Sequence, residues 1–273
     1  MNIYYSIMPG RVSQKIFITA GYLKYLFSAR SAGSIHSPFV FELYRDVIQN
    51  KSSFPGFRKV EELRSSLLRS SETIDTIDLG AGSNILSTKK KKISSIVKSY
   101  SKTEKYGRLL FRLADFFKPE KILELGTSLG LSTAYLASPS GSIRVTTLEG
   151  CPETADAARK NFKKISLENI EVITGNFNDT LSAALKKTGN PGLVFFDGNH
   201  RKEPTLRYFR ECLEHSSAGS VFIFDDIHWS EEMEDAWIEI KKHSTVTCTI
   251  DLFFLGLVFF RKEMTKQDFV LRF

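Results

Sequence analysis

The chain has 273 residues, of which 42% are hydrophobic and 25% are charged, and its formal charge is +7. This composition is ordinary for a folded globular protein and excludes disorder along the whole chain. No apolar run approaches the ~20 residues that cross a bilayer, and the first residues lack the apolar core of a secretory signal. The three cysteines are widely spaced and form neither a disulfide framework nor a zinc-type pair. We therefore expect a cytoplasmic protein without a transmembrane segment.

The charge is distributed unevenly along the chain. Residues 1–118 carry 20 basic and 9 acidic side chains, whereas residues 119–273 carry 18 basic and 22 acidic ones. Such an asymmetry indicates two regions with different roles. We predict a basic, mainly helical N-terminal extension over residues 1–105 and a second domain over residues 106–273.

Amphipathic patterns in the first region predict helices over residues 12–29, 39–49, 61–71 and 106–117. Residues 54–56 (F-P-G) indicate a turn. Residues 73–87 contain one predicted strand and a glycine turn. The lysine run 89–92 is typical of a solvated loop.

From residue 121 onward, short apolar runs alternate with amphipathic stretches of about a dozen residues. The predicted strands are 121–125, 144–148, 170–174, 193–196 and 221–224. This alternation predicts a doubly wound, Rossmann-like α/β fold whose mostly parallel sheet is covered on both faces. Two further strand-like runs, 245–251 and 256–261, have no helix between them, so the sheet is expected to end in an antiparallel hairpin.

The most informative motif runs from Glu124 to Gly130 (E-L-G-T-S-L-G), between a predicted strand and a predicted helix. Glycines there allow a tight turn and let a ligand approach the backbone N–H groups. Ser128 stands where the dinucleotide fingerprint G-x-G-x-x-G needs its second glycine to admit a pyrophosphate. A carboxylate at the strand end would repel phosphate, but it suits a ligand with an amino group and a sulfonium.

This motif resembles the first motif of the class I S-adenosylmethionine-dependent methyltransferases, an acid at a strand end followed by a glycine loop. Two more motifs follow in the family's order. Glu149-Gly150 ends the second predicted strand, and in the family an acid at this place holds the ribose hydroxyls. Asn176-Phe177 follows the third predicted strand, where a polar and an apolar residue flank adenine in the family. The resemblance covers about residues 106–261 and implies that S-adenosylmethionine is the cofactor, bound by Glu124, Gly126, Thr127, Ser128, Gly130, Glu149, Gly150, Asn176, Phe177 and Asp197. For any one of these motifs taken alone, a purely structural role remains the alternative.

A second glycine motif, residues 78–83 (D-L-G-A-G-S), resembles such a loop even more closely in its letters. No amphipathic helix follows it, and the next residues are polar and basic. We interpret it as a plain structural turn, with a position over the cofactor mouth as the alternative.

Acidic residues also end the fourth and fifth predicted strands. Asp197 and His200 follow the fourth strand, and Asp225 and Asp226 follow the fifth. Because the carboxyl ends of parallel strands lie at one edge of the sheet, these groups are expected to meet the cofactor there. Three carboxylates so close together require a cation or a raised pKa.

This cluster resembles the O-methyltransferase branch of the family, including catechol-type enzymes. The resemblance implies Asp197, Asp225 and Asp226 as ligands of Mg²⁺ or another divalent cation, with Asp226 in place of the family's Asn. His200 stands at the position of the family's lysine base, and a histidine titrates near neutrality. Asp197 and His200 are therefore the predicted catalytic residues. The same letters also resemble a broader group of class I methyltransferases for which a metal does not follow.

Residues 31–44 resemble the N-terminal extensions of some bacterial methyltransferases of this type. Their aromatic side chains, at helical spacing, are expected to pack on the sheet domain or on a partner subunit, which leaves a homodimer open. The lysine run and its surroundings could instead guide an anionic substrate, a nucleic acid or a membrane surface.

The sequence thus predicts an S-adenosylmethionine-dependent methyltransferase that methylates an oxygen of a small-molecule acceptor. Two alternatives remain open. One is an RNA methyltransferase that uses the basic N-terminal region as a nucleic-acid platform. The other is a binding module that has the cofactor fold without catalysis.

Overall fold

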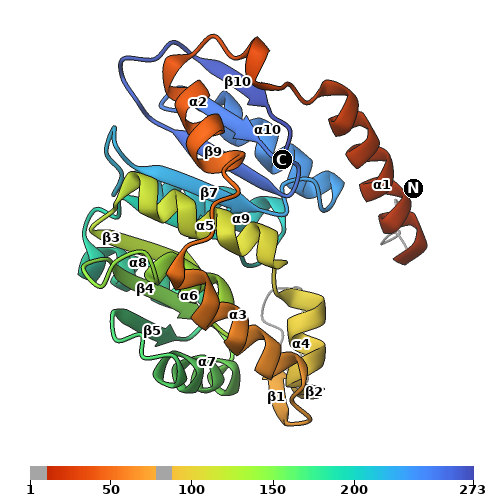
Figure 1. Cartoon of the computed structure of the whole chain (residues 1–273), viewed down its shortest axis with the longest axis vertical. Helices are drawn as coiled ribbons and strands as arrows, with labels where there is room; N and C mark the ends of the chain where they lie inside the picture. The colour runs from red at the N-terminus through yellow and green to blue at the C-terminus, as the bar shows by residue number, and fades with distance from the viewer. Residues whose placement is uncertain (1–10, 78–87) are drawn as a thin grey trace, which may run out of the picture.

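An eight-stranded sheet forms the centre of the computed structural model, which describes residues 11–77 and 88–273 (Figure 1). The strand order is β10-β8-β9-β7-β6-β3-β4-β5. The strands are β3 Lys121–Leu125, β4 Arg144–Glu149, β5 Ile170–Thr174, β6 Leu193–Phe196, β7 Val221–Asp225, β8 Cys248–Asp251, β9 Leu255–Phe259 and β10 Gln267–Val270. The five strands from β7 to β5 are parallel, so their carboxyl ends lie along one edge. The site described below lies at this edge.

The C-terminal part of the sheet confirms the predicted hairpin and adds one strand to it. Strand β9 pairs antiparallel with both β7 and β8. Strand β10, which the sequence did not predict, pairs parallel with β8 at the edge. Of its four residues only Phe269 is buried, so the segment lacks the alternating pattern by which a strand is recognised.

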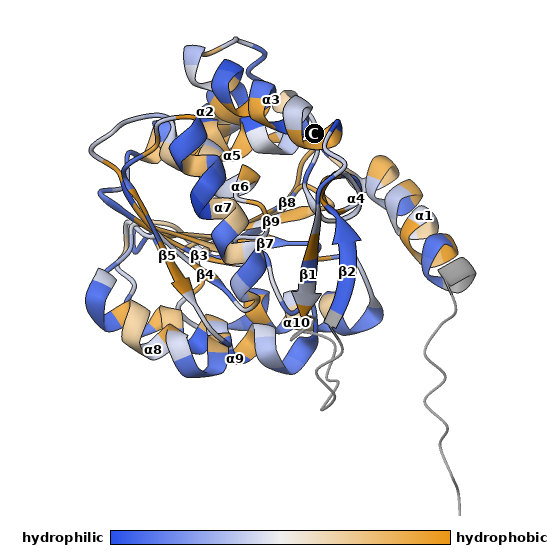
Figure 2. Cartoon of the chain, turned by 90° about the horizontal axis from the view of Figure 1, so that it is seen from below, coloured by the Kyte–Doolittle hydropathy of each residue, from blue (hydrophilic) through white to orange (hydrophobic). Residues whose placement is uncertain are grey.

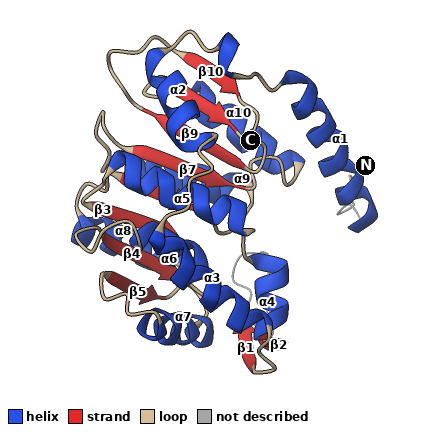
Figure 3. Cartoon of the chain, in the orientation of Figure 1, coloured by secondary structure: helices blue, strands red, loops and turns tan. Residues whose placement is uncertain are grey.

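Helices cover both faces of the sheet (Figures 2 and 3). One face carries α5 Glu104–Phe117, α6 Leu131–Ala137 and α7 Pro152–Lys164, and the other carries α8 Phe177–Thr188, α9 Lys202–Leu213 and α10 Glu231–Lys242. Two hydrophobic clusters fill the spaces between the sheet and these layers. The arrangement confirms the predicted doubly wound, Rossmann-like α/β fold.

The N-terminal region packs into one of these two clusters. Its elements are α1 Arg11–Ser28, a 3₁₀ turn Ala32–Ser34, α2 Pro38–Leu43, a π-helical turn Tyr44–Ile48, α3 Pro55–Leu68, β1 Thr73–Ile77, β2 Thr88–Lys92 and α4 Ile93–Tyr100. Val40 and Val60 are fully buried in the same hydrophobic cluster as Leu109 of α5 and Ile122 of β3. The division into two domains near residue 105 stays a prediction.

Two local expectations in this region are wrong. The turn expected at residues 54–56 is the start of α3, because Pro55 occupies the first helical turn, where its missing N–H has no partner to lose. The solvated loop expected at the lysine run is strand β2, which pairs antiparallel with β1. Pairing with β1 satisfies backbone hydrogen-bonding groups of β2, and lysine side chains are common on the edge strands of sheets. The sequence also gave no indication of α4, and residues 78–83 lie outside the described part of the chain.

The N-terminal helix is joined to the C-terminal end of the chain. Tyr25 of α1 is buried, and its hydroxyl donates a hydrogen bond to the Leu271 carbonyl oxygen at 2.6 Å. The Phe273 N–H donates to the same hydroxyl at 3.0 Å. Beyond this contact, α1 exposes Ile16 and Phe27. No helix among residues 11–77 and 88–273 is long and apolar enough to cross a membrane.

The close packing of α5 on α6 leaves no room for a side chain at Gly107, and this can be tested. A Cβ atom at this position would lie 2.2 Å from the ring of Tyr135, which is buried. We expect Gly107→Ala to lower the free energy of unfolding by about 1–3 kcal/mol, because overpacking outweighs the better helix propensity of alanine. Urea unfolding followed by circular dichroism measures this. Gly33→Ala, which adds a Cβ into open space, is the control; equal stability of the two variants would contradict the packing.

Candidate functional site

The glycine loop connects β3 to α6 and rests on the ends of two neighbouring strands. The N–H groups of Gly126 and Thr127 donate to the Leu148 carbonyl oxygen at 3.0 and 3.1 Å. Gly126 has a φ of 110°, and a Cβ there would lie 2.0 Å from the Asp197 carbonyl oxygen. Only glycine therefore allows the loop to approach the end of β6 this closely.

Glu149 at the end of β4 is tied to the same loop. Its carboxylate accepts hydrogen bonds from the backbone N–H groups of Ser128 at 2.8 Å and Cys151 at 2.9 Å. Burial raises the pKa of the Glu149 carboxyl above its ordinary value, and these N–H groups oppose the rise. The predicted second motif and the glycine loop thus form one hydrogen-bonded unit.

A cavity of about 280 Å³ opens beside this unit. Of the residues predicted to bind the cofactor, those that line the cavity are Gly126, Ser128, Glu149, Gly150, Asn176, Phe177 and Asp197. Phe177 begins α8, and its ring makes an edge contact with Tyr208 at 5.9 Å between centroids. The three predicted motifs therefore converge on one cavity.

Three of the predicted cofactor residues are buried behind the loop. Glu124 and Thr127 are fully buried, and Gly130 packs against the ring of Phe162. One Glu124 oxygen accepts hydrogen bonds from the hydroxyls of Thr133 and of Thr147, the latter at 2.6 Å. These residues support the shape of the loop from beneath, and their predicted contact with a cofactor stays a prediction.

Part of the cavity wall comes from the N-terminal region, which sequence reasoning did not anticipate. Thr76 and Ile77 of β1, Lys91 of β2 and Ile96 of α4 all line the cavity. The Cys151 thiol lies 3.5 Å from the Asp75 carbonyl oxygen, which connects β1 to the end of β4. No motif marks these residues as part of a site, so only the three-dimensional packing reveals them.

The predicted catalytic residues meet at the end of β6. The imidazole Nε2 of His200 lies 3.6 Å from the Asp197 carboxylate. Burial alone would lower the pKa of His200, but Asp197, Asp226 and Asp225 outweigh it and raise the pKa to about 9. At neutral pH the ring therefore holds its proton and is a cation beside Asp197.

Asp225 and Asp226 at the end of β7 complete the predicted cluster. Burial and the Asp197 carboxylate raise the pKa of the Asp225 carboxyl to about 7. Ligand atoms of Asp197, His200 and Asp225 lie within 4.8 Å of one another. This spacing could hold a metal ion, and the predicted ligand set stays a prediction.

The cluster contains one residue that the sequence did not indicate. The ammonium nitrogen of Lys102 lies 2.8 Å from Asp225 Oδ2 and 2.6 Å from Asp226 Oδ1. Burial would lower the pKa of Lys102, but the two carboxylates raise it above its ordinary value. The only signal in the sequence was indirect, because three clustered carboxylates demanded a cation without saying which residue supplies it.

Comparison with known proteins agrees with this geometry. Residues 123–227 match a family model described as a methyltransferase domain. The chain is 34% identical over 124 residues to a catechol O-methyltransferase from Mycobacterium tuberculosis. The matched stretch covers 44% of this chain and 54% of that protein. The chain is 32% identical over 125 residues to one from Niastella koreensis, which covers 44% and 55%. The chain thus spans about half the length of the curated relatives it matches.

Solved structures agree on the fold. The chain resembles an O-methyltransferase from Bacillus cereus, solved in complex with SAH, with a TM-score of 0.54 and 21% identity over 81% of this chain and 97% of that one. At this identity the likeness concerns the fold alone. Residues 123–227 are thus similar to a methyltransferase domain, and the fold around them is that of this O-methyltransferase structure.

The buried Glu124 carboxyl predicts an unusual dependence of stability on pH. Burial raises its pKa from 4.5 to about 7, so the folded protein retains a proton that the unfolded chain releases. The free energy of unfolding should therefore fall by roughly 3 kcal/mol as the pH rises from about 4 to 8. Glu124→Gln should remove this contribution. Urea unfolding at several pH values measures the slope, with the exposed Glu153→Gln as the control; identical slopes for wild type and Glu124→Gln would refute the assignment.

Proposed function

We propose that this protein transfers the methyl group of S-adenosylmethionine to a hydroxyl oxygen of a small-molecule acceptor. The observation that carries the proposal is one cavity at the carboxyl edge of the sheet. Its walls combine the glycine loop, the Glu149 carboxylate and the Asn176-Phe177 pair, and the Asp197–His200 cluster stands at its end. Ligands bind at this edge in open α/β sheets.

The residues of the cavity fit this cofactor. Gly126 lines the cavity, so its backbone can contact a ligand there. Glu149 offers carboxylate oxygens for ribose hydroxyls, and Phe177 offers an apolar ring for an adenine. We also propose that residues 106–273 form the cofactor-binding domain and that residues 1–105 are an extension that adds to its wall.

S-adenosylmethionine, when bound, supplies a methyl group whose bond to sulfur breaks, with its electron pair going to sulfur, as the bond to the acceptor oxygen forms. The chain must orient the acceptor and manage its proton. A phenolic hydroxyl has a pKa of about 10, close to that of His200 at about 9. The fraction of His200 that is neutral can therefore take the acceptor's proton at little cost, and the imidazolium that forms favours the acceptor oxyanion.

The acceptor class follows from the relatives rather than from the cavity. Two of them are named catechol O-methyltransferases, so we propose a hydroxylated aromatic compound with adjacent hydroxyl groups. No specific observation favours the RNA methyltransferase or the non-catalytic module. A homodimer remains a proposal, and the three free, buried cysteines fit a reducing, cytoplasmic location.

Cofactor binding tests the Glu149 assignment. We expect isothermal titration calorimetry to detect S-adenosylmethionine binding, and Glu149→Ala to weaken it by roughly ten- to a hundredfold, because buried hydrogen bonds to a charged group are lost. Glu149→Gln, which keeps one acceptor oxygen, should bind with intermediate affinity. Glu153→Ala, which removes an exposed carboxylate from α7, is the matched control. Unchanged binding by Glu149→Ala would overturn the cofactor assignment.

Methyl transfer itself tests the proposed activity. With catechol and isotopically labelled S-adenosylmethionine, we expect mass spectrometry to detect the O-methyl product. Asp197→Asn should lower kcat/KM by about a hundredfold, because His200 loses its charged partner. Asp235→Asn, an exposed substitution on α10, should retain full activity. If a broad panel of hydroxylated aromatic acceptors gives no product while the cofactor binds, the non-catalytic alternative is favoured.

A further inference from the structure

Lys102 reaches the acidic cluster from the short linker between α4 and α5. Its carbonyl oxygen accepts a hydrogen bond from Arg64 of α3 at 2.8 Å, which holds the linker backbone. Its ammonium nitrogen lies 5.7 Å from the centre of the Phe254 ring. The side chain is only 17% exposed. Lys102 is therefore held in place from both ends and does not sample solvent like a surface lysine.

The ammonium group occupies the position that a divalent ion would need. It lies within hydrogen-bond distance of one carboxylate oxygen of Asp225 and one of Asp226. Mg²⁺ binds its oxygen ligands at about 2.0–2.1 Å in octahedral geometry, and a positively charged nitrogen on the same carboxylates repels it. The other donors near Asp225 are the Asp197 carboxylate and the His200 imidazole, and Mg²⁺ prefers oxygen to an imidazole nitrogen. With Lys102 on Asp225 and Asp226, the residues present thus do not fit the divalent ion that the family resemblance implies at Asp197, Asp225 and Asp226.

Protein side chains compensate all but one of the cluster's negative charges without a metal. Three carboxylates, Asp197, Asp225 and Asp226, face two cationic groups, Lys102 and His200. Paired charges of this kind meet the requirement for compensation that burial imposes. A further divalent cation would leave the cluster with excess positive charge.

We propose that Lys102 is the fixed cation of the acceptor site and takes the place of a divalent metal ion, so that methyl transfer proceeds without one. This inference rests on the proposed function for its catalytic part. Lys102 acts as a positioning residue: its ammonium orients the two carboxylates at the end of β7 and supplies positive potential where the acceptor oxygen loses its proton. The N-terminal region thereby contributes a residue to the chemistry of the sheet domain.

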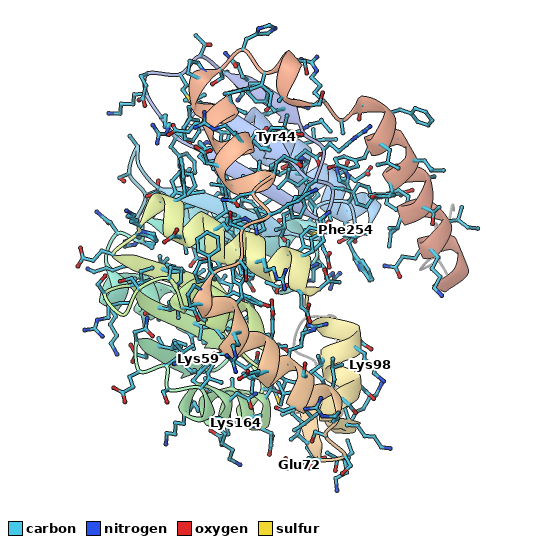
Figure 4. The ribbon with its side chains drawn as sticks, viewed as in Figure 1. Tyr44, Lys59, Glu72, Lys98, Lys164 and Phe254 are labelled. Atoms are coloured by element: carbon cyan, nitrogen blue, oxygen red, sulfur yellow. The ribbon has the colours of Figure 1, made fainter. Side chains whose placement is uncertain are left out.

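Metal binding tests the position of the cation independently of any acceptor. We expect calorimetric titration with Mn²⁺ to show that Lys102→Met, which vacates the position, binds Mn²⁺ at least about tenfold more tightly than the wild type does. Lys102→Arg keeps the charge and should behave as the wild type. Lys98→Met removes the exposed lysine of α4 that Figure 4 labels and is the matched control. Equal Mn²⁺ affinity of wild type and Lys102→Met would overturn the proposal.

Activity tests the catalytic part. Wild-type kcat/KM should be the same in a chelator and in added Mg²⁺. Lys102→Met should lose about a hundredfold in kcat, more than in KM, because the lost charge acts on the transition state, and Lys102→Arg should recover part of the loss. Wild-type activity that is lost in the chelator and restored by Mg²⁺ would overturn the proposal, even if Lys102→Met failed to fold. If no acceptor is methylated by any variant, the proposed function fails, while the Mn²⁺ titration still decides the place of Lys102.

Discussion

The gathering of one buried and two partly buried carboxylates at the ends of two adjacent strands is the constraint on which the site depends. Parallel β6 and β7 bring Asp197, Asp225 and Asp226 to one edge, where burial and Asp197 raise the pKa of Asp225, and burial and Asp225 raise the pKa of Asp226. Two cationic side chains from different parts of the chain compensate most of this negative charge. His200 comes from the same loop as Asp197, and Lys102 comes from a segment 124 residues before Asp226. Without these cations the edge could not hold three negative charges next to a binding cavity.

The cofactor side of the cavity depends on backbone rather than on charge. Gly126 lets the loop pass within van der Waals contact of the end of β6, and the loop's N–H groups bind to the end of β4. Glu149 is bonded to that loop, so any movement of the loop also moves the acid proposed to hold the ribose. The threonines around Glu124 keep the strand end in place from below. Binding and support are thus divided between residues that line the cavity and residues beneath it.

Local patterns predicted the parts of this architecture that depend on neighbours in sequence. The βα alternation, the glycine loop and the acids at the strand ends are short-range signals, and they led to the fold, the cavity and the cluster at β6 and β7. Strand β2 is wholly polar and strand β10 has no apolar alternation, so both were missed; pairing partners rather than periodicity define them. Lys102 was missed for a similar reason. Nothing in S-K-T distinguishes it from a surface lysine until α3 and β7 enclose it.

The role of the N-terminal region therefore depends on where its basic residues lie rather than on its net charge. Its excess of basic residues suggested a platform for a polyanion, yet Lys91 lines the cavity and Lys102 binds the acidic cluster. Both lysines face the domain whose own sequence is net acidic. Lys102 pairs with Asp225 and Asp226 across the two regions, so this basic residue of the extension compensates charge that the sheet domain holds at its edge. The positive charge of the extension is then partly an internal requirement of the site, and only the remainder is available to an outside partner.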